Sequence, residues 1–342
     1  MNIFRYKHDF VTEGGFRFPT LDIAYHTYGT LNERGDNVIW VCHALTANSD
    51  VASWWPGMVG DGLLFDTSRY FVVCANIPGS CYGSTGPLSV NEFTGDPWYL
   101  DFPLLTIRDV VRALDLLRRH LQINRIKMVI GASVGGQQAI EYSIMYPELI
   151  EKLVFIASNA RQSPWAVAFN ESQRLAIEAD PSFRIRNPFG GREGLKAARS
   201  IALLSYRNHI TYNRTQEEKS DAVVHGFKAS SYQVYQGEKL VKRFNPWSYY
   251  RLTQMTDSHN VGRGRGGLKK ALQGISASVL CIGISSDLLF PVDELRLVAA
   301  TVADGRYTEI DSDYGHDGFL TESEKITGQV REFIETGNLV LQ

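Results

Sequence analysis

The sequence predicts an α/β protein with a mostly parallel central sheet flanked by helices and an inserted helical segment. Two observations predict this class. Apolar runs rich in Val and Ile, which are typical of buried parallel strands, occur at residues 37–42, 70–77, 127–133, 152–158 and 278–284. Segments with helical spacing of apolar residues lie between most of these runs, and the alternation is interrupted only between residues 161 and 272.

Other elements follow from local patterns. Residues 16–31 alternate loosely between apolar and polar side chains, which predicts antiparallel edge strands before the parallel core begins. Thr106 is the expected N-cap of a helix with one apolar face, and Asp109 is favourable in the first turn of that helix. A further strand is expected at residues 306–310, and the helical spacing of residues 326–334 predicts a closing helix over the sheet.

The interval from Arg161 to Leu272 contains helix-like segments at residues 165–179 and 194–206 but no convincing buried strand. We interpret residues 161–272 as a helical lid domain inserted between core strands. Residues 1–160 and 273–342 then form one core domain. A chain of 342 residues that is 44% hydrophobic is long enough for a single α/β domain with such an insertion.

Composition limits the classes of partner. With 35 basic and 37 acidic residues, the formal net charge of −2 indicates neither a nucleic-acid partner nor an anionic membrane, so small-molecule substrates are expected. No run of about 18 apolar residues occurs, and residues 1–8 lack the apolar stretch of a secretory signal, which predicts a cytoplasmic location. The four cysteines lack metal-ligand spacing, so reduced packing residues and no metal site are expected.

Ser133 is the candidate nucleophile. It follows an apolar β-branched run and precedes a helical pattern in the stretch Gly131-Ala132-Ser133-Val134-Gly135-Gly136. This order is typical of a nucleophile elbow, in which a sharp turn presents one hydroxyl at the tip of a strand. Small residues on both sides of the serine let strand and helix approach closely.

A serine hydroxyl needs a histidine to accept its proton and an acid to orient that histidine. Asp287 follows the strand 278–284, and His316 follows the strand 306–310, which is the chain order expected after a nucleophile elbow. Asp311 and Asp313 are weaker alternatives for the acid.

Acyl transfer also needs amides that stabilise an oxyanion. The amide after the nucleophile belongs to Val134, and we assign the second to Leu45, which lies directly beyond the strand ending near Cys42. His43 is an alternative base, but it precedes the serine in the chain and is interpreted as shaping this loop.

The segment Gly262-Arg263-Gly264-Arg265-Gly266-Gly267 superficially suggests an RNA-binding tract. It occurs once in a chain without basic excess, so RNA binding is disfavoured. Two readings stay open at this point: its arginines contact the phosphates of a cofactor such as coenzyme A, or they cap a helix that begins near Leu268.

Taken together, these motifs resemble the homoserine O-acyltransferases of methionine biosynthesis, a family of the α/β-hydrolase superfamily. The resemblance extends over almost the whole chain. The motifs that carry it are residues 43–46, 65–67, 69–74, 79–87, the elbow, and residues 168–171, 262–267, 286–291 and 314–317.

The resemblance implies a triad of Ser133, Asp287 and His316, with Leu45 and Val134 as the oxyanion amides. It also implies that the amino-acid acceptor is bound by an arginine and a tyrosine on a lid helix and by the aspartate after the catalytic histidine. These positions look like Arg199, Tyr206 and Asp317, with Arg207 as a nearby alternative. The family further suggests a homodimer through the lid helices.

Our hypothesis is a two-step transfer of acetyl from acetyl-CoA, a substrate and not a permanently bound cofactor, to the hydroxyl of L-homoserine. Ala132 and Val134 depart from the residues that many relatives carry at the elbow, so a succinyl group is kept as an alternative to acetyl. Serine is kept as an alternative acceptor to homoserine. An esterase on the same scaffold, which the triad alone does not exclude, is the first alternative. A non-catalytic binding protein that retained the fold is the second.

Overall fold

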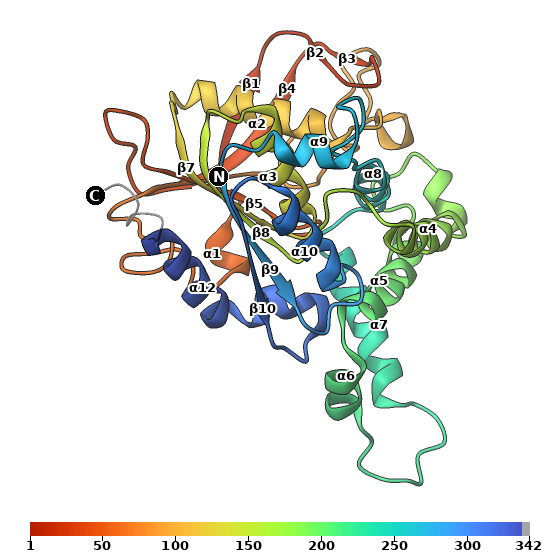
Figure 1. Ribbon diagram of the computed structural model, residues 1–342. Helices are drawn as coiled ribbons and strands as arrows, with labels where there is room; N and C mark the ends of the chain where they lie inside the picture. The colour runs from red at the N-terminus through yellow and green to blue at the C-terminus, as the bar shows by residue number, and fades with distance from the viewer. Residues whose placement is uncertain (337–342) are drawn as a thin grey trace.

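The computed structural model describes residues 1–336. An eight-stranded sheet runs through the molecule in the order β1-β4-β6-β5-β7-β8-β9-β10 (Figure 1). Its strands are β1 Asn2–Tyr6, β4 Leu21–Tyr28, β5 Val38–Cys42, β6 Phe71–Ala75, β7 Ile126–Ala132, β8 Ile150–Ile156, β9 Ser278–Ile284 and β10 Gly305–Ile310. The pairs from β6 to β10 are parallel, which confirms the predicted class.

The antiparallel edge is only partly as expected. β4 pairs antiparallel with β6, as the alternation in residues 16–31 predicts, but β1 adds an outer strand that the sequence did not indicate. Only Phe4 and Tyr6 of this five-residue strand pack partly against the core, and two positions are too few for a sequence pattern to reveal. β3 Arg17–Phe18 pairs with β2 Phe10–Val11 in a separate two-stranded sheet.

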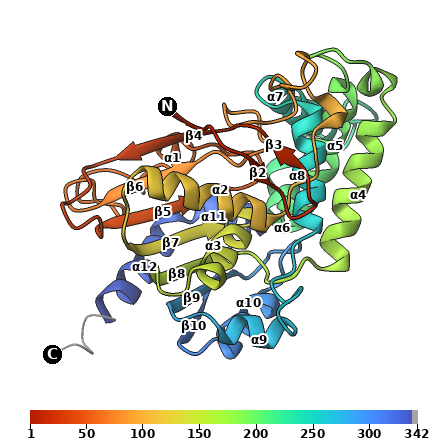
Figure 2. The ribbon, with the colours of Figure 1, turned by 90° about the horizontal axis from the view of Figure 1, so that it is seen from above.

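Helices cover both faces of the sheet (Figure 2). The core on one face includes residues of α2 Ile107–His120, α3 Val134–Met145, α9 Leu268–Gln273 and α10 Val292–Thr301. The core on the other includes residues of α1 Val51–Trp54, α11 Gly318–Thr321 and α12 Ser323–Thr336. Short 3-10 turns lie at Tyr99–Asp101, Pro181–Arg184 and Gly315–Asp317.

The start of α2 confirms the predicted cap. Thr106 Oγ1 accepts a hydrogen bond from the amide of Asp109 at 3.2 Å, and the Asp109 carboxylate accepts one from the amide of Thr106 at 2.9 Å. This reciprocal capping box satisfies two amides that a helix N-terminus otherwise leaves without partners.

Between β8 and β9 the elements are helical. The name lid is used here for α4 Pro164–Glu178, α5 Arg192–Tyr206, α6 His209–Gln216, α7 Lys228–Val241 and α8 Pro246–Asp257. Figure 1 shows these helices on one side of the sheet, with the loop after α6 protruding from the molecule. The proposed division into domains at residues 160/161 and 272/273 stays a prediction.

The four thiols are free, and those of Cys42, Cys74 and Cys281 are buried. Cys42 and Cys281 belong to the core on one face of the sheet, and Cys74 belongs to the core on the other. Within residues 1–336, no helix is both long enough and apolar enough to cross a bilayer.

Candidate active site

Ser133 lies in the sharp turn between β7 and α3. Its backbone has φ 58° and ψ −128°, in a region that a residue with a side chain rarely adopts. The turn puts the serine at the carboxyl end of a parallel strand and directly before a helix N-terminus, as the sequence predicts. Such strain persists only where the surrounding structure holds it.

Neighbouring glycines make this turn possible. A Cβ on Gly131 would lie 2.2 Å from the carbonyl oxygen of Gly135, and one on Gly135 would lie 2.1 Å from that of Cys42. A Cβ on Gly136 would approach the Cβ of Ser158 to 2.5 Å. The helix therefore packs against the strand ends at a distance that only glycine allows.

The structure brings Asp287 and His316 together from two successive strand ends. His316 Nδ1 donates a hydrogen bond to Asp287 Oδ2 at 2.7 Å, because a carboxylate can only accept. Asp287 Oδ1 accepts from the amides of Leu289 and Phe290 at 2.8 and 3.0 Å. Both carboxylate oxygens are thus held, and the pair is almost fully buried.

The alternative acids do not occupy this position. Asp311 and Asp313 are exposed, and the Asp313 carboxylate lies 3.9 Å from Arg214. The alternative base, His43, has both of its ring nitrogens engaged in hydrogen bonds to the backbone. His43 Nε2 accepts from the amide of Ile77 at 3.1 Å, and its Nδ1 donates to the carbonyl of Ala44 at 2.8 Å.

The pKa values of the two buried histidines, His43 and His316, are shifted in opposite directions. Burial lowers the pKa of His43 to about 4, despite the hydrogen bond to Ala44. Burial also opposes protonation of His316, but the carboxylates of Asp287 and Asp317 outweigh it, so its pKa lies above the ordinary value of 6.5. His43 is a neutral structural residue that holds its loop, whereas His316 has the environment of a proton acceptor.

The two residues expected to supply the oxyanion amides line a pocket together with the serine. Leu45, Ser133 and Val134 line one small pocket of about 30 Å³. Val134 is the first residue of α3, where an amide has no partner within its own helix. The loop carrying Leu45 is fastened to α3, because Gln138 Nε2 donates to the carbonyl of His43 at 3.1 Å.

The other residues lining this small pocket are mostly uncharged and polar: Gln137, Gln162, Asn170, Tyr206 and Thr256, with the apolar Leu289 and Phe290. Of the two elbow residues Ala132 and Val134, only Val134 lines it. Ala132 packs in the sheet core on the other face and is 3% exposed.

A larger cavity of about 580 Å³ opens beside Ser133 and His316. All three residues implied by the family resemblance, Arg199, Tyr206 and Asp317, line this cavity, and so does Arg207. The guanidinium of Arg199 lies 5.4 Å from the centre of the Tyr206 ring. Lid helix α5 thus carries an arginine and a tyrosine to the same cavity as the serine.

Arg207, the alternative cation, already has a partner. Its Nε lies 3.2 Å from Asp317 Oδ2, although the geometry is not that of a hydrogen bond. The cavity lining also includes residues to which the sequence assigned no function, among them Trp54, Gln236, Lys239 and Arg243. Nothing in their local pattern points to a site, because only the docking of α1 and α7 brings them to the cavity.

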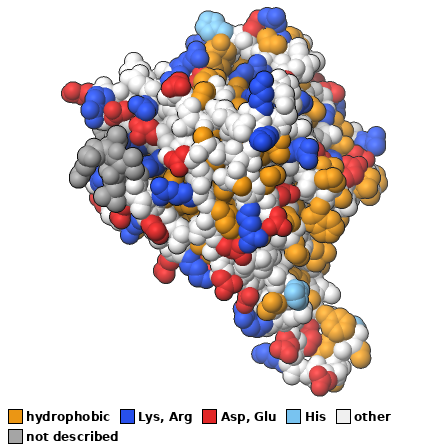
Figure 3. Space-filling model, viewed as in Figure 1, with side chains coloured by type: hydrophobic (Ala, Val, Ile, Leu, Met, Phe, Trp, Pro, Cys, Tyr) orange, Lys and Arg blue, Asp and Glu red, His pale blue; other side chains and the backbone are white. Residues whose placement is uncertain are grey.

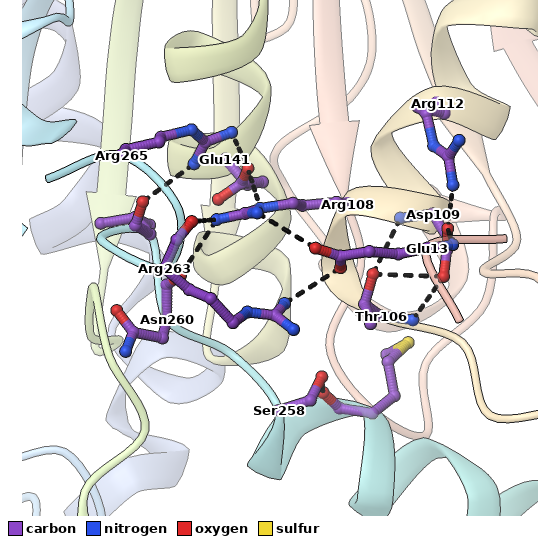
Figure 4. A network of polar contacts seen from close by, with 12 residues as sticks. Glu13, Thr106, Arg108, Asp109, Arg112, Glu141, Ser258, Asn260, Arg263 and Arg265 are labelled. Carbon is purple, nitrogen blue, oxygen red and sulfur yellow. Dashed lines mark hydrogen bonds and ion pairs between the residues drawn. The ribbon is translucent and has the colours of Figure 1, made fainter. Parts of the chain in front are cut away.

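The glycine–arginine segment 262–267 has a structural role instead of either expected one. Figure 4 shows Arg263, Arg265 and Arg108 interleaved with Glu13 and Glu141. Arg263 Nη2 lies 3.0 Å from Glu13, Arg265 pairs with Glu141, and Arg108 lies 3.1 Å and 3.2 Å from these two carboxylates.

Segment 262–267 lies outside the cavity lining, so its arginines do not meet a ligand there. α9 begins at Leu268 without a side-chain cap, so they do not cap it either. Two carboxylates shared by three guanidiniums instead fasten this segment to α2, α3 and the loop before β3. Such a network is invisible to sequence patterns, since its ion pairs join residues between 33 and 250 positions apart.

Comparisons with known proteins agree with this geometry. A model of the alpha/beta hydrolase fold matches residues 37–323. The homoserine O-acetyltransferase of Cyclobacterium marinum is 47% identical over 95% of this chain and 93% of its own length. That of Chlorobium luteolum is 40% identical over 97% and 93%.

Solved structures are similar as well. The homoserine O-acetyltransferase from Bacillus anthracis superposes with a TM-score of 0.88 at 26% identity, covering 97% of this chain and 96% of that one. Esterase E22 superposes at 0.89 with 23% identity over 97% and 99%, a likeness of fold alone. The chain therefore has the alpha/beta hydrolase fold and belongs to the homoserine O-acetyltransferase family of enzymes.

Proposed function

We propose that this enzyme transfers an acetyl group from acetyl-CoA to the hydroxyl of L-homoserine through an acetyl-serine intermediate. The observation that carries the proposal is the 2.7 Å hydrogen bond between Asp287 and His316, because His316 lines a cavity together with Ser133 and with charged side chains suited to an amino acid. The homoserine O-acetyltransferases of similar sequence support the choice of acyl group and acceptor.

In the first step, His316 Nε2 accepts the proton of Ser133, and Oγ attacks the thioester carbon. The amides of Leu45 and Val134 stabilise the oxyanion, as their place in one pocket with Ser133 supports. The carbon–sulfur bond then breaks, and the thiol of CoA leaves with the proton that His316 held.

In the second step, His316 accepts the proton of the homoserine hydroxyl, which attacks the acetyl carbon. The acetyl–serine bond breaks as the new ester forms, and the proton returns from His316 to Ser133 Oγ. Asp287 keeps the proton on His316 Nδ1 throughout, so Nε2 is free to accept in both steps.

Arg199 is the proposed partner of the acceptor's α-carboxylate, and Asp317 that of its α-ammonium. Arg199 lines the cavity and takes part in no ion pair with the described carboxylates, whereas Arg207 lies against Asp317. The free charge of Arg199 favours it over Arg207 for the carboxylate. The ring of Tyr206 lies beside both Arg199 and His316, so it forms the wall of the site between the proposed carboxylate partner and the catalytic base.

Arg199→Gln should therefore raise the KM for homoserine about a hundredfold, because a charge-assisted pair to the carboxylate is lost. The rate of CoA release from acetyl-CoA in the absence of homoserine should change far less. Arg207→Gln, the same chemical change eight residues further along the chain, should raise this KM less than Arg199→Gln. Steady-state kinetics of both variants checks the assignment, and a larger effect at Arg207 would reverse it.

The pocket of about 30 Å³ beside Leu45, Ser133 and Val134 favours acetyl over succinyl. None of the residues that line this pocket carries a charge, so the carboxylate that ends a succinyl chain would have no charged partner there, whereas a methyl group needs none. We propose that Val134, at the start of α3, and Leu289, in the loop after β9, form the apolar part of this lining and select the acyl group.

A matrix of assays tests the function as a whole. Free thiol is measured with acetyl-CoA or succinyl-CoA, each with homoserine, with serine and without an acceptor. Thiol release from acetyl-CoA that depends on homoserine supports the proposal. Release that is equal with and without each acceptor would instead indicate the esterase alternative, whose scaffold esterase E22 shares.

The pH dependence should follow His316, whose neutral form is the base. Since the pKa of His316 lies above 6.5, the first step should slow as the pH falls through that raised pKa. Asp317→Asn removes one of the carboxylates that raise the pKa of His316. The rate of the CoA burst, measured without homoserine, should therefore begin to fall at a lower pH in this variant. Asp313→Asn should leave this pH unchanged, and a shift to higher pH in Asp317→Asn would contradict the assignment.

We also propose that the enzyme is a homodimer through its lid helices in the cytoplasm. Large apolar side chains are exposed on this part of the chain, and Figure 3 shows them gathered beside α4 and α5 and near the protruding tip. They include Trp165, Leu175, Leu204, Ile210, Phe227, Val234 and Tyr235. Sedimentation equilibrium tests the dimer, and Leu204→Glu with Val234→Glu should give a monomer.

A further inference from the structure

The large cavity contains more positive charge than the proposed amino-acid acceptor requires. Its lining includes four cations, Arg199, Arg207, Lys239 and Arg243, and a single carboxylate, Asp317. Arg207 lies against Asp317, and Arg199 is assigned to the acceptor's carboxylate. The proposed acceptor therefore leaves the charges of Lys239 and Arg243 without an assigned role.

These two cations belong to one face of α7 and the turn that follows it. The lining residues Gln236, Lys239, Leu240 and Arg243 are spaced by three, one and three positions, as on a single helical face. Lys239 and Arg243 are exposed overall and still line the cavity, so they lie where it opens to solvent.

Arg243 is held in place without being neutralised. It donates to the carbonyl of Thr46, to Thr46 Oγ1 at 3.2 Å and to the Tyr82 hydroxyl at 2.8 Å. All of these acceptors are uncharged. The carboxylate next to Lys239 in sequence, Glu238, instead pairs with Lys196 at 2.6 Å. Neither cation has an ion-pair partner among residues 1–336.

We propose that Lys239 and Arg243 bind the phosphate groups of a nucleotide thioester donor at the cavity mouth, while the thioester end of the donor reaches Ser133. The inference rests on the proposed function, which supplies acetyl-CoA as that donor. A lysine is a mobile point charge for phosphate, and a fixed guanidinium adds directed donors. A cavity of about 580 Å³ has room for the uncharged arm between the two ends.

Lys239→Glu tests this assignment without disturbing the site. Arg243 is a poorer choice for the first variant, because its bonds to Thr46 support the loop that carries Leu45. Lys242→Glu is the matched control: Lys242 is exposed on the turn after α7, outside the cavity lining. Both variants change the net charge of the chain by the same amount, so general electrostatic steering is equal.

Each variant is assayed with acetyl-CoA and with S-acetylpantetheine, which has the same thioester arm but no phosphate. Relative to the unchanged chain, the ratio of kcat/KM for the two donors should fall about tenfold in Lys239→Glu and stay constant in Lys242→Glu. An equal fall in both variants, or no fall in Lys239→Glu, would overturn the proposal.

Binding of adenosine 3′,5′-bisphosphate to the Ser133→Ala chain, measured by calorimetry, gives a second readout that needs no turnover. Adding Lys239→Glu should weaken this binding about tenfold, and absence of any binding to Ser133→Ala would contradict the phosphate site. Failure of the proposed function is separately visible: the unchanged chain would then release no CoA from acetyl-CoA in the presence of homoserine.

Discussion

Ser133→Ala should abolish the burst of CoA release and lower kcat by roughly 10⁵-fold or more, because no other group can form the acetyl intermediate. Alanine retains the Cβ and takes the same strained backbone at φ 58°, so the elbow should fold unchanged. Stopped-flow measurement of free thiol after mixing with acetyl-CoA reports the burst directly.

Controls for Ser133→Ala separate lost chemistry from lost structure. Thermal unfolding of the variant should match that of the unchanged chain within a few degrees, since no packed atom other than Oγ is removed. A fluorophosphonate probe should label the unchanged chain and leave the variant unlabelled. A retained burst in a folded variant would exclude Ser133 as the nucleophile.

Asp287→Asn should lower kcat about 10⁴-fold while leaving the fold in place. The asparagine oxygen can keep the bonds from the amides of Leu289 and Phe290, but its amide nitrogen then faces His316 Nδ1 as a donor. His316 would hold its proton on Nε2 instead, the position that must accept the proton of Ser133. The loss therefore comes from the wrong tautomer and not from disorder.

Single-turnover kinetics of Asp287→Asn checks this expectation. Asp311→Asn and Asp313→Asn make the same chemical change at the exposed carboxylates that precede His316, and each should retain nearly full activity. If either control lost as much activity as Asp287→Asn, the acid would be misassigned, since the loops after β9 and β10 that carry the three carboxylates follow neighbouring strands.

The α/β class and the triad candidates were predictable because each depends on a local pattern. Continuous Val- and Ile-rich runs mark strands buried on both faces, and the sequence around Ser133 carries the glycines that its close approach requires. Asp287 and His316 were selected because each comes shortly after a predicted parallel strand, and functional side chains gather at the carboxyl ends of such strands. The strand β1 was missed because only Phe4 and Tyr6 mark its inner face, and two positions do not make a recognisable pattern.

The residues of the acceptor site could be proposed only through family resemblance. Nothing local distinguishes Arg199 from any solvated helix residue, and the structure is what places it over Tyr206 in the cavity with Ser133. Arg207 was an open alternative in the sequence. Its contact with Asp317 joins residues 110 positions apart along the chain and distinguishes it from Arg199.

The sequence by itself determined the α/β class, the nucleophile elbow and the order of serine, acid and base, because these are written in short-range periodicity and turn chemistry. Only the tertiary structure decided that the arginines of segment 262–267 pair with Glu13 and Glu141, and that Lys239 and Arg243 line the cavity mouth. The reason is physical: the charge of a side chain is a property of its residue, but the partner of that charge depends on which elements pack together.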